Sequence, residues 1–113
     1  MVPVIDHTEK TMDKQKRQEL ATAICDQLGG MGRLQAMINA RDFMILQPGA
    51  QFRFSGCRQA NVVKIKLADD DTYTVDFWKN SGIDWTNVET IERVHAAQLK
   101  ETIEDFTGLA LSL

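Results

Sequence analysis

The residue types that most often carry chemistry are few in this chain and stand far apart. They are His7, Cys25, Cys57 and His95. A zinc site built from cysteine and histidine needs closely spaced pairs of ligands, and no two of these four residues form such a pair. We therefore predict no metal site, and we interpret the two cysteines as unrelated free thiols in a reducing compartment.

Two further segments have the composition of a ligand site but lack essential parts of one. Asp69, Asp70 and Asp71 are adjacent carboxylates, yet the oxygen ligands at fixed offsets and the closing glutamate of an EF-hand loop do not follow them. The glycine-rich residues 29–32 lack the lysine and hydroxyl residue of a phosphate-binding loop, and no strand precedes them. We interpret the first segment as a polar hairpin turn and the second as the end of a helix.

Two single residues are weak candidates for catalysis. His95, beside Glu92 and Arg93, has the side chain of a general base, but no partner nucleophile can be named for it. Cys57 has one cationic neighbour, Arg58, and a single adjacent charge is weak evidence for a reactive thiol. The sequence therefore predicts a protein that is not an enzyme and that carries no cofactor.

The charge distribution along the chain is more informative than these motifs. The 113 residues carry a net charge of −3, but residues 30–66 carry +5 and residues 67–113 carry −7. The mildly acidic total argues against attraction of the whole surface to a polyanion, so a site for one has to be a local patch. No run approaches the ~18 to 20 apolar residues of a membrane span, and we expect a cytosolic protein with no membrane partner.

Helical periodicity marks both ends of the chain. Apolar residues recur every four positions within residues 11–28, two glycines follow, and residues 34–38 have the apolar spacing of a short second helix. The first third is thus predicted to be a helical hairpin. Residues 96–106 predict a last helix that Gly108 ends, and the leucines at 109, 111 and 113 predict an extended segment tucked against the body.

The middle of the chain alternates with a period of two, as a strand with one wet face requires. Residues 52–54, 61–67 and 72–77 show this alternation, residues 41–47 predict an additional strand, and the charged residues 88–94 predict an edge strand. A three-residue loop at 69–71 collects the large apolar groups on one face. It sets Leu67 opposite Tyr73, Ile65 opposite Val75 and Val63 opposite Phe77.

These elements predict one α+β domain over residues 1–113, with an N-terminal helical hairpin, a central antiparallel sheet of three to five strands and a C-terminal helix packed on its apolar face. The residues expected to be largely buried are Leu20, Ile24, Leu28, Leu34, Ile38, Phe52, Phe54, Val63, Ile65, Leu67, Tyr73, Val75, Phe77, Leu99, Ile103 and Phe106. Those expected on the other sheet face are Val62, Lys64, Lys66, Thr74, Asp76 and Trp78.

Several short motifs carry a family resemblance over roughly residues 20–113. They are Leu-Gly-Gly-Met-Gly-Arg-Leu-Gln-Ala-Met at 28–37, Phe-Arg-Phe at 52–54, Asn-Val-Val-Lys-Ile-Lys-Leu at 61–67, Asp-Thr-Tyr at 71–73, and Thr-Gly-Leu at 107–109 with Leu113. In these motifs the chain resembles a group of small uncharacterised proteins encoded by bacteriophages and other mobile elements. The group has no assigned activity, so the resemblance implies a genomic context in a bacterial host and no catalytic residues.

Two function classes remain, and both are binding functions. In the first, the outer sheet face binds nucleic acid. The residues proposed for this role are Arg53, Arg58, Lys64, Lys66 and Trp78. In the second, the acidic C-terminal half docks on a basic surface of a host or phage protein, as an inhibitor or modulator. The sequence leaves open the partner, the oligomeric state and whether Trp78 is simply packed.

The nucleic-acid hypothesis includes a specific geometric expectation. If Phe52 and Phe54 are to be buried with the apolar residues of 61–67, pairing Phe54 with Val63 and Phe52 with Ile65 sets Arg53 opposite Lys64. Like charges placed opposite each other repel, so an anion or an acidic neighbour such as Asp76 would be expected to offset them.

Overall fold

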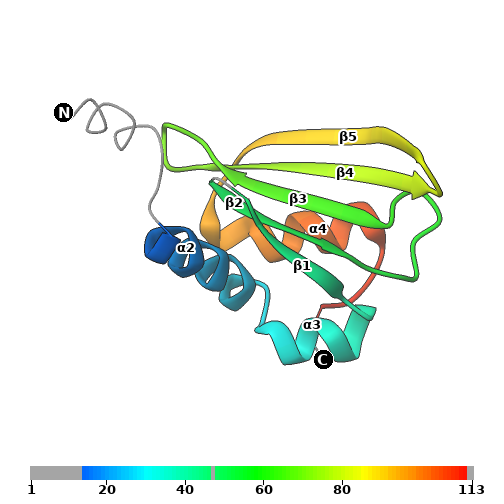
Figure 1. Cartoon of the computed structure of the whole chain (residues 1–113), viewed down its shortest axis with the longest axis horizontal. Coiled ribbons are helices and arrows are strands. Elements are labelled where there is room, and N and C mark those ends of the chain that lie inside the picture. The colour runs from blue at the N-terminus through cyan, green and yellow to red at the C-terminus, as the bar shows by residue number, and fades with distance from the viewer. Residues whose placement is uncertain (1–13, 47, 112–113) are drawn as a thin grey trace.

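The computed structural model describes residues 14–46 and 48–111. Two helices begin this part of the chain, five strands follow, and a short 3₁₀ turn leads into a last helix (Figure 1). The elements are α2 (Lys14–Gln27), α3 (Met31–Ile38), β1 (Arg41–Leu46), β2 (Gly49–Arg53), β3 (Val62–Leu67), β4 (Tyr73–Ser81), β5 (Asp84–Val94), η1 (Ala96–Gln98) and α4 (Leu99–Thr107).

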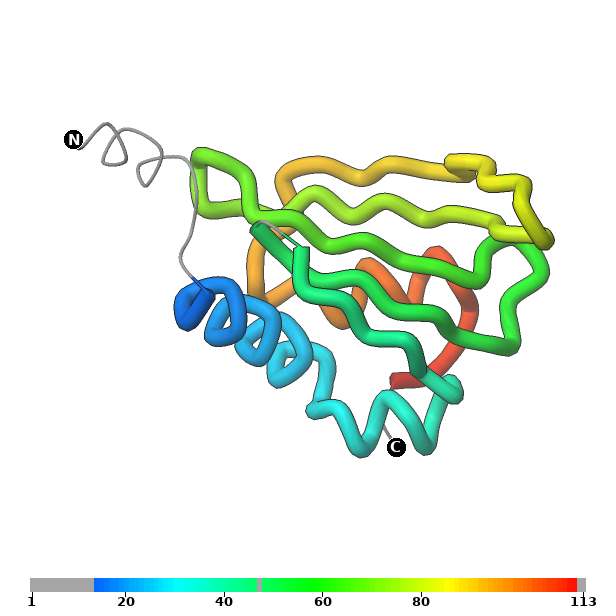
Figure 2. The backbone as a smooth tube through the Cα atoms, viewed as in Figure 1, coloured from blue at the N-terminus to red at the C-terminus, as the bar shows by residue number. Residues whose placement is uncertain are grey.

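The five strands form one antiparallel sheet in which each strand lies beside its neighbours in sequence, in the order β1-β2-β3-β4-β5. The tube in Figure 2 follows this meander from β1 at one edge to β5 at the other. The α+β class, the antiparallel sheet and the C-terminal helix are therefore as predicted, and the edge position of residues 88–94 is confirmed within a longer strand.

The β3–β4 register agrees with the sequence prediction at every expected pair, Val63 with Phe77, Ile65 with Val75 and Leu67 with Tyr73. The hairpin closes when the N–H of Ala68 donates to the carbonyl oxygen of Thr72 (2.7 Å). Asp71 has φ 65°, a left-handed conformation that aspartate tolerates in turns. The three aspartates are thus a turn, as the sequence indicated.

One aspartate of this turn also binds Thr72, two residues further along the chain. The Asp70 carboxylate accepts hydrogen bonds from the side-chain hydroxyl and the backbone N–H of Thr72, at 2.6 and 3.1 Å. These bonds stabilise the charged form, so the pKa of Asp70 lies below its ordinary value. The carboxylate of Asp70 therefore stabilises the hairpin itself.

The predicted β2–β3 register is wrong by two residues. Phe52 lies opposite Val63, Arg53 lies opposite Val62, and the partner of Lys64 is Gln51. A shift of two residues keeps every side chain on its own face, so burial of the phenylalanines could not distinguish the registers. Gly49 does distinguish them, because a Cβ at this position would collide with the carbonyl oxygen of Ile65.

The helices α2 and α3 are separated by two glycines with positive φ, 110° at Gly29 and 96° at Gly30. The N–H of Gly30 closes α2 by donating to the carbonyl oxygen of Cys25 (2.8 Å). The predicted helix start near Thr11 lies outside the described residues, and the arrangement of the N-terminal region as a hairpin stays a prediction. No helix in the described ranges is both long enough and apolar enough to cross a membrane.

The core lies between one face of the sheet and the helices. Most of the predicted core residues are buried there, and the rings of Phe77 and Phe106 stack with centroids 4.1 Å apart, which joins β4 to α4. The prediction of burial is corrected for Leu20, Leu67 and Phe106, which are only partly buried and pack against the core. Leu67 and Phe106 lie near the ends of β3 and α4, where fewer neighbours cover them.

The chain end after α4 packs back onto the body, as predicted for the alternating leucines. Leu111 is fully buried, and its N–H donates to Oε2 of Glu104 (2.9 Å). Leu109 lies against Gly56, where an added Cβ would approach its side chain to 3.0 Å. The third residue of the pattern, Leu113, lies outside the described residues.

Candidate functional site

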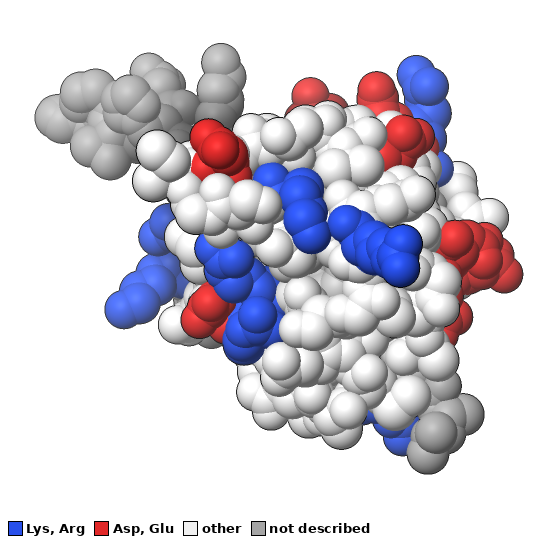
Figure 3. Space-filling model, turned by 90° about the vertical axis from the view of Figure 1, so that its right-hand side faces the viewer, with Lys and Arg blue, Asp and Glu red and all other residues white. Residues whose placement is uncertain are grey.

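The sheet face directed away from the helices, here called the outer face, carries the residues proposed for binding. Arg53, Lys64 and Trp78 lie on this face, as do Asp76 and Asn80 of β4. Figure 3 shows one side of the molecule on which several Lys and Arg side chains gather toward the middle while acidic groups lie mainly around them.

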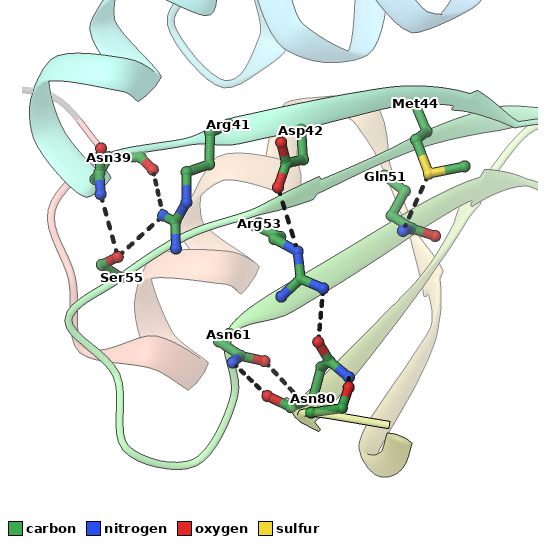
Figure 4. A network of polar contacts seen from close by, with 10 residues as sticks. Asn39, Arg41, Asp42, Met44, Gln51, Arg53, Ser55, Asn61 and Asn80 are labelled. Carbon is green, nitrogen blue, oxygen red and sulfur yellow. Dashed lines mark hydrogen bonds and ion pairs between the residues drawn. The ribbon is translucent and has the colours of Figure 1, made fainter. Parts of the chain in front are cut away.

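Arg53 joins three strands through two polar contacts (Figure 4). Its Nε lies 3.3 Å from Oδ2 of Asp42 on β1, and its Nη2 donates to Oδ1 of Asn80 on β4 at 2.6 Å. The Asp42 side chain is 66% exposed, so this ion pair is worth at most about 1 kcal/mol. Arg53 is therefore held in place, but its link to Asp42 is weak enough to exchange.

Asn80 is fixed in turn by contacts within and beyond its own strand. It exchanges hydrogen bonds with Asn61, whose Nδ2 donates to its carbonyl oxygen (2.9 Å) and whose Oδ1 accepts from its N–H (2.8 Å). Its side-chain amide donates to the carbonyl oxygens of Gly82 and Asp84 at 3.0 and 3.1 Å. The amide orientation leaves Oδ1 as the acceptor for Arg53.

Two tryptophans on the outer face each lie beside a cation. The Lys64 ammonium lies 4.6 Å from the ring centroid of Trp78, and the Arg53 guanidinium carbon lies 5.6 Å from that of Trp85. Both distances are within the range of cation–π attraction. The two rings are 6.4 Å apart and inclined by 69°. We call Arg53, Lys64, Trp78 and Trp85 the tryptophan–cation cluster.

The two rings differ in exposure. Trp85 is 45% exposed, whereas Trp78 is half-buried. Trp78 lies opposite Val62, and Val62 is fully buried although it is not part of the main core. The Nε1 of Trp78 is shielded from solvent and has no hydrogen-bond partner among the described residues. Trp78 therefore forms a packed base for the cluster, and Trp85 offers the accessible ring.

Asp76 does not form an ion pair with Lys64, although the two residues are opposite each other in the register. The carboxylate of Asp76 instead accepts a hydrogen bond from the Thr90 hydroxyl of β5 (2.7 Å). The directly opposed pair of Arg53 and Lys64 that was expected does not form, because Arg53 lies opposite Val62 and Lys64 lies opposite Gln51.

The remaining predicted binding residues lie outside the tryptophan–cation cluster. Lys66 is exposed near the far end of β3, and Arg58 is exposed in the loop between β2 and β3. Trp85 was missed by the sequence prediction. A signal for it exists, since Gly82 and Ile83 form a two-residue turn that pairs Ser81 with Asp84 and so sets Trp85 opposite Asn80.

The other candidates of the sequence analysis occupy separate places. His95 is exposed ahead of η1, and Cys57 is half-buried in the β2–β3 loop. Both cysteines are free thiols, as expected. Within residues 14–46 and 48–111, no three His, Cys, Asp or Glu side chains come together as a metal site would require.

The comparisons with known proteins return no match: no family model, no curated protein and no solved structure is similar to this chain.

Proposed function

We propose that the outer face binds single-stranded nucleic acid through the tryptophan–cation cluster. The observation that carries the proposal is the placement of two tryptophans, each beside a cation, on one sheet face. Proteins that bind single strands combine this pair of features, because bases stack on aromatic rings while cations neutralise phosphates.

The four residues have distinct roles in this proposal. Trp85, with its exposed ring, stacks with an unpaired base, a contact worth about 1–3 kcal/mol. Arg53 and Lys64 turn from the rings toward the phosphates on either side of that base. Trp78 supports the site from below, since it is half-buried and packed opposite Val62. Lys66 and Arg58 extend the positive charge beyond the cluster.

A single strand is the substrate class because a duplex does not offer a free base face to Trp85. Stacking on an aromatic side chain needs an unstacked base, which duplexes release only at a cost of a few kcal/mol. Binding through phosphates alone would instead favour the duplex, with its higher charge density. The ratio of single-strand to duplex affinity thus reports whether Trp85 takes part.

The experiment is a fluorescence-anisotropy titration of a short labelled oligothymidylate at about 50 mM salt, where phosphate contacts are strong. Trp85→Ala is expected to weaken binding about 10-fold, the loss of one stacking contact. The matched control is Ile83→Ala, because Ile83 is 94% exposed in the same hairpin and has no ring or charge. Equal affinities of the two variants would contradict the proposed role of Trp85.

We also propose that the protein acts without catalysis, as an accessory protein of a phage or other mobile element in the cytoplasm of a bacterial host. The support is the resemblance of its sequence motifs and the wide separation of its histidines and cysteines along the chain. If oligothymidylate does not bind, the remaining hypothesis is a protein partner for the acidic residues 67–113.

A further inference from the structure

An uncharged recess lies between α2 and β1. It has a volume of about 250 Å³, and its lining includes Ala21 and Cys25 of α2 with Phe43 and Ile45 of β1. The α2 side chains are small, so the helix leaves space beside the strand where larger residues would close the core. We call this recess the α2–β1 groove.

Exposed apolar side chains concentrate at this groove. Met31 and Ile45 are each 48% exposed, and both line it. Apolar side chains exposed together in a hollow mark sites of interaction more often than apolar residues scattered singly. Neither residue belongs to the tryptophan–cation cluster, so the groove is separate from the proposed nucleic-acid site.

The groove lies beside an open sheet edge. β1 is the terminal strand of the sheet, and in the part of the chain that the structure describes no further strand pairs with its outer edge (Figure 1). Its pairing with β2 is regular from Met44 to Leu46, the stretch that borders the groove. Register shifts discourage strand addition; β1 has one, between Arg41 and Met44, and β5 at the other edge has two, so residues 44–46 are the regular part of the open β1 edge.

Basic residues lie at one end of the groove. Lys14 and Arg17 line an adjoining hollow of about 220 Å³, which shares Gln18 and Ile45 with the groove. A ligand that follows the groove to this end meets positive charge, which favours carboxylates there.

We propose that the α2–β1 groove binds an extended, acidic segment of a partner protein, which adds to β1 as a further strand. Backbone hydrogen bonds to β1 supply affinity, and alternate side chains of the segment supply specificity. Its apolar side chains enter the groove against Ile45 and Phe43, and its carboxylates lie near Lys14 and Arg17.

A second copy of this chain fits the groove less well than such a partner. The β1 strand that a second copy would offer, Arg41–Leu46, carries a single carboxylate, Asp42, and that group already contacts Arg53. The charge complementarity at Lys14 and Arg17 therefore requires a different, more acidic segment.

The test measures binding of a fluorescein-labelled peptide with two aspartates followed by alternating valine and threonine. A matched peptide with two lysines in place of the aspartates is titrated in parallel. Ile45→Lys is expected to weaken binding of the acidic peptide at least about 10-fold, since it places a charge in the apolar groove. Ile83→Lys, at the distant β4–β5 turn, is the control and is expected to bind as the unmodified protein does.

Any of three binding results would overturn the proposal. They are no binding of the acidic peptide up to about 1 mM, equal affinity of the two peptides, and unchanged binding by Ile45→Lys. A dimer that Ile45→Lys converts to a monomer, observed by light scattering, would also overturn it by assigning the groove to a second copy. A thermal melt of each variant confirms that it is folded.

Oligothymidylate affinity is expected to be unchanged in Ile45→Lys. Failure of the peptide to bind is therefore distinguishable from failure of the nucleic-acid proposal.

Discussion

The guanidinium carbon of Arg53 lies 5.6 Å from the ring centroid of Trp85, although 32 positions of sequence separate the two residues. The contact exists because β2 and β5 bring these residues to the same sheet face, while Asn80 of β4 holds the guanidinium from the side at 2.6 Å. The contact joins the basic residues 30–66, which include Arg53, to the acidic residues 67–113, which include Trp85. It places a cation beside an exposed aromatic ring on the outer face.

Asp42 limits the availability of Arg53 and provides a test of its role. Because its carboxylate competes with a phosphate for the guanidinium, Asp42→Asn is expected to strengthen oligothymidylate binding several-fold, within the ~1 kcal/mol range of an exposed ion pair. Anisotropy titrations measure the change. Asp105→Asn, an equal change in net charge on the exposed part of α4, is the control, and an equal gain in both variants would attribute the effect to net charge alone.

Gly49→Ala tests the close approach of β2 to β3. The added Cβ would meet the carbonyl oxygen of Ile65, a backbone atom that cannot move without disturbing the sheet. We expect the free energy of unfolding in urea to fall by about 1–3 kcal/mol, the usual cost of overpacking. Gly32→Ala in α3 is the control, since nothing lies within 4 Å of its added Cβ. A Gly49→Ala variant as stable as this control would show that the observed register is wrong.

Burial of Cys25 and Tyr73 predicts a loss of stability in alkali. Burial raises the pKa of both groups in the folded state, with Asp26 adding to the effect at Cys25. A raised pKa means that the folded state disfavours the ionised forms. The stabilisation is therefore complete below the ordinary values of 9.0 and 10.0 and is lost as the pH rises through the folded-state pKa values.

Urea denaturation at a series of alkaline pH values measures this loss. Tyr73→Phe is expected to reduce its dependence on pH, because phenylalanine has no group to ionise. An identical alkaline decline in Tyr73→Phe and the unmodified protein would show that Tyr73 does not contribute.

The parts of the fold that the sequence predicted are those governed by short-range constraints. The β3–β4 register followed from a three-residue loop, because a shift by one residue would have set Ile65 against Asp76. The β2–β3 register did not follow, since the loop over residues 54–61 is long and a shift of two residues preserves both faces. The decisive residue, Gly49, acts through a tertiary clash that alternation does not reveal.

The candidate site was predicted only in part for a similar reason. Arg53, Lys64 and Trp78 were placed on the correct face by alternation alone. Trp85 was not found, because the predicted strand ended at Phe77 and was not extended to the turn at Gly82 and Ile83, which sets Trp85 opposite Asn80. Alternation within one strand does not show which residue of the next strand lies opposite until the turn is identified.

The most direct test of nucleic-acid binding by the outer face is the salt dependence of oligothymidylate affinity. A plot of the logarithm of the association constant against the logarithm of salt concentration is expected to have a negative slope, and each lost phosphate contact reduces its magnitude by about 0.7 for a single strand. Arg53→Ala and Lys64→Ala should each weaken binding and each make the slope shallower by this amount. Absence of binding by the unmodified protein at about 50 mM salt, or slopes unaffected by both substitutions, would contradict the account.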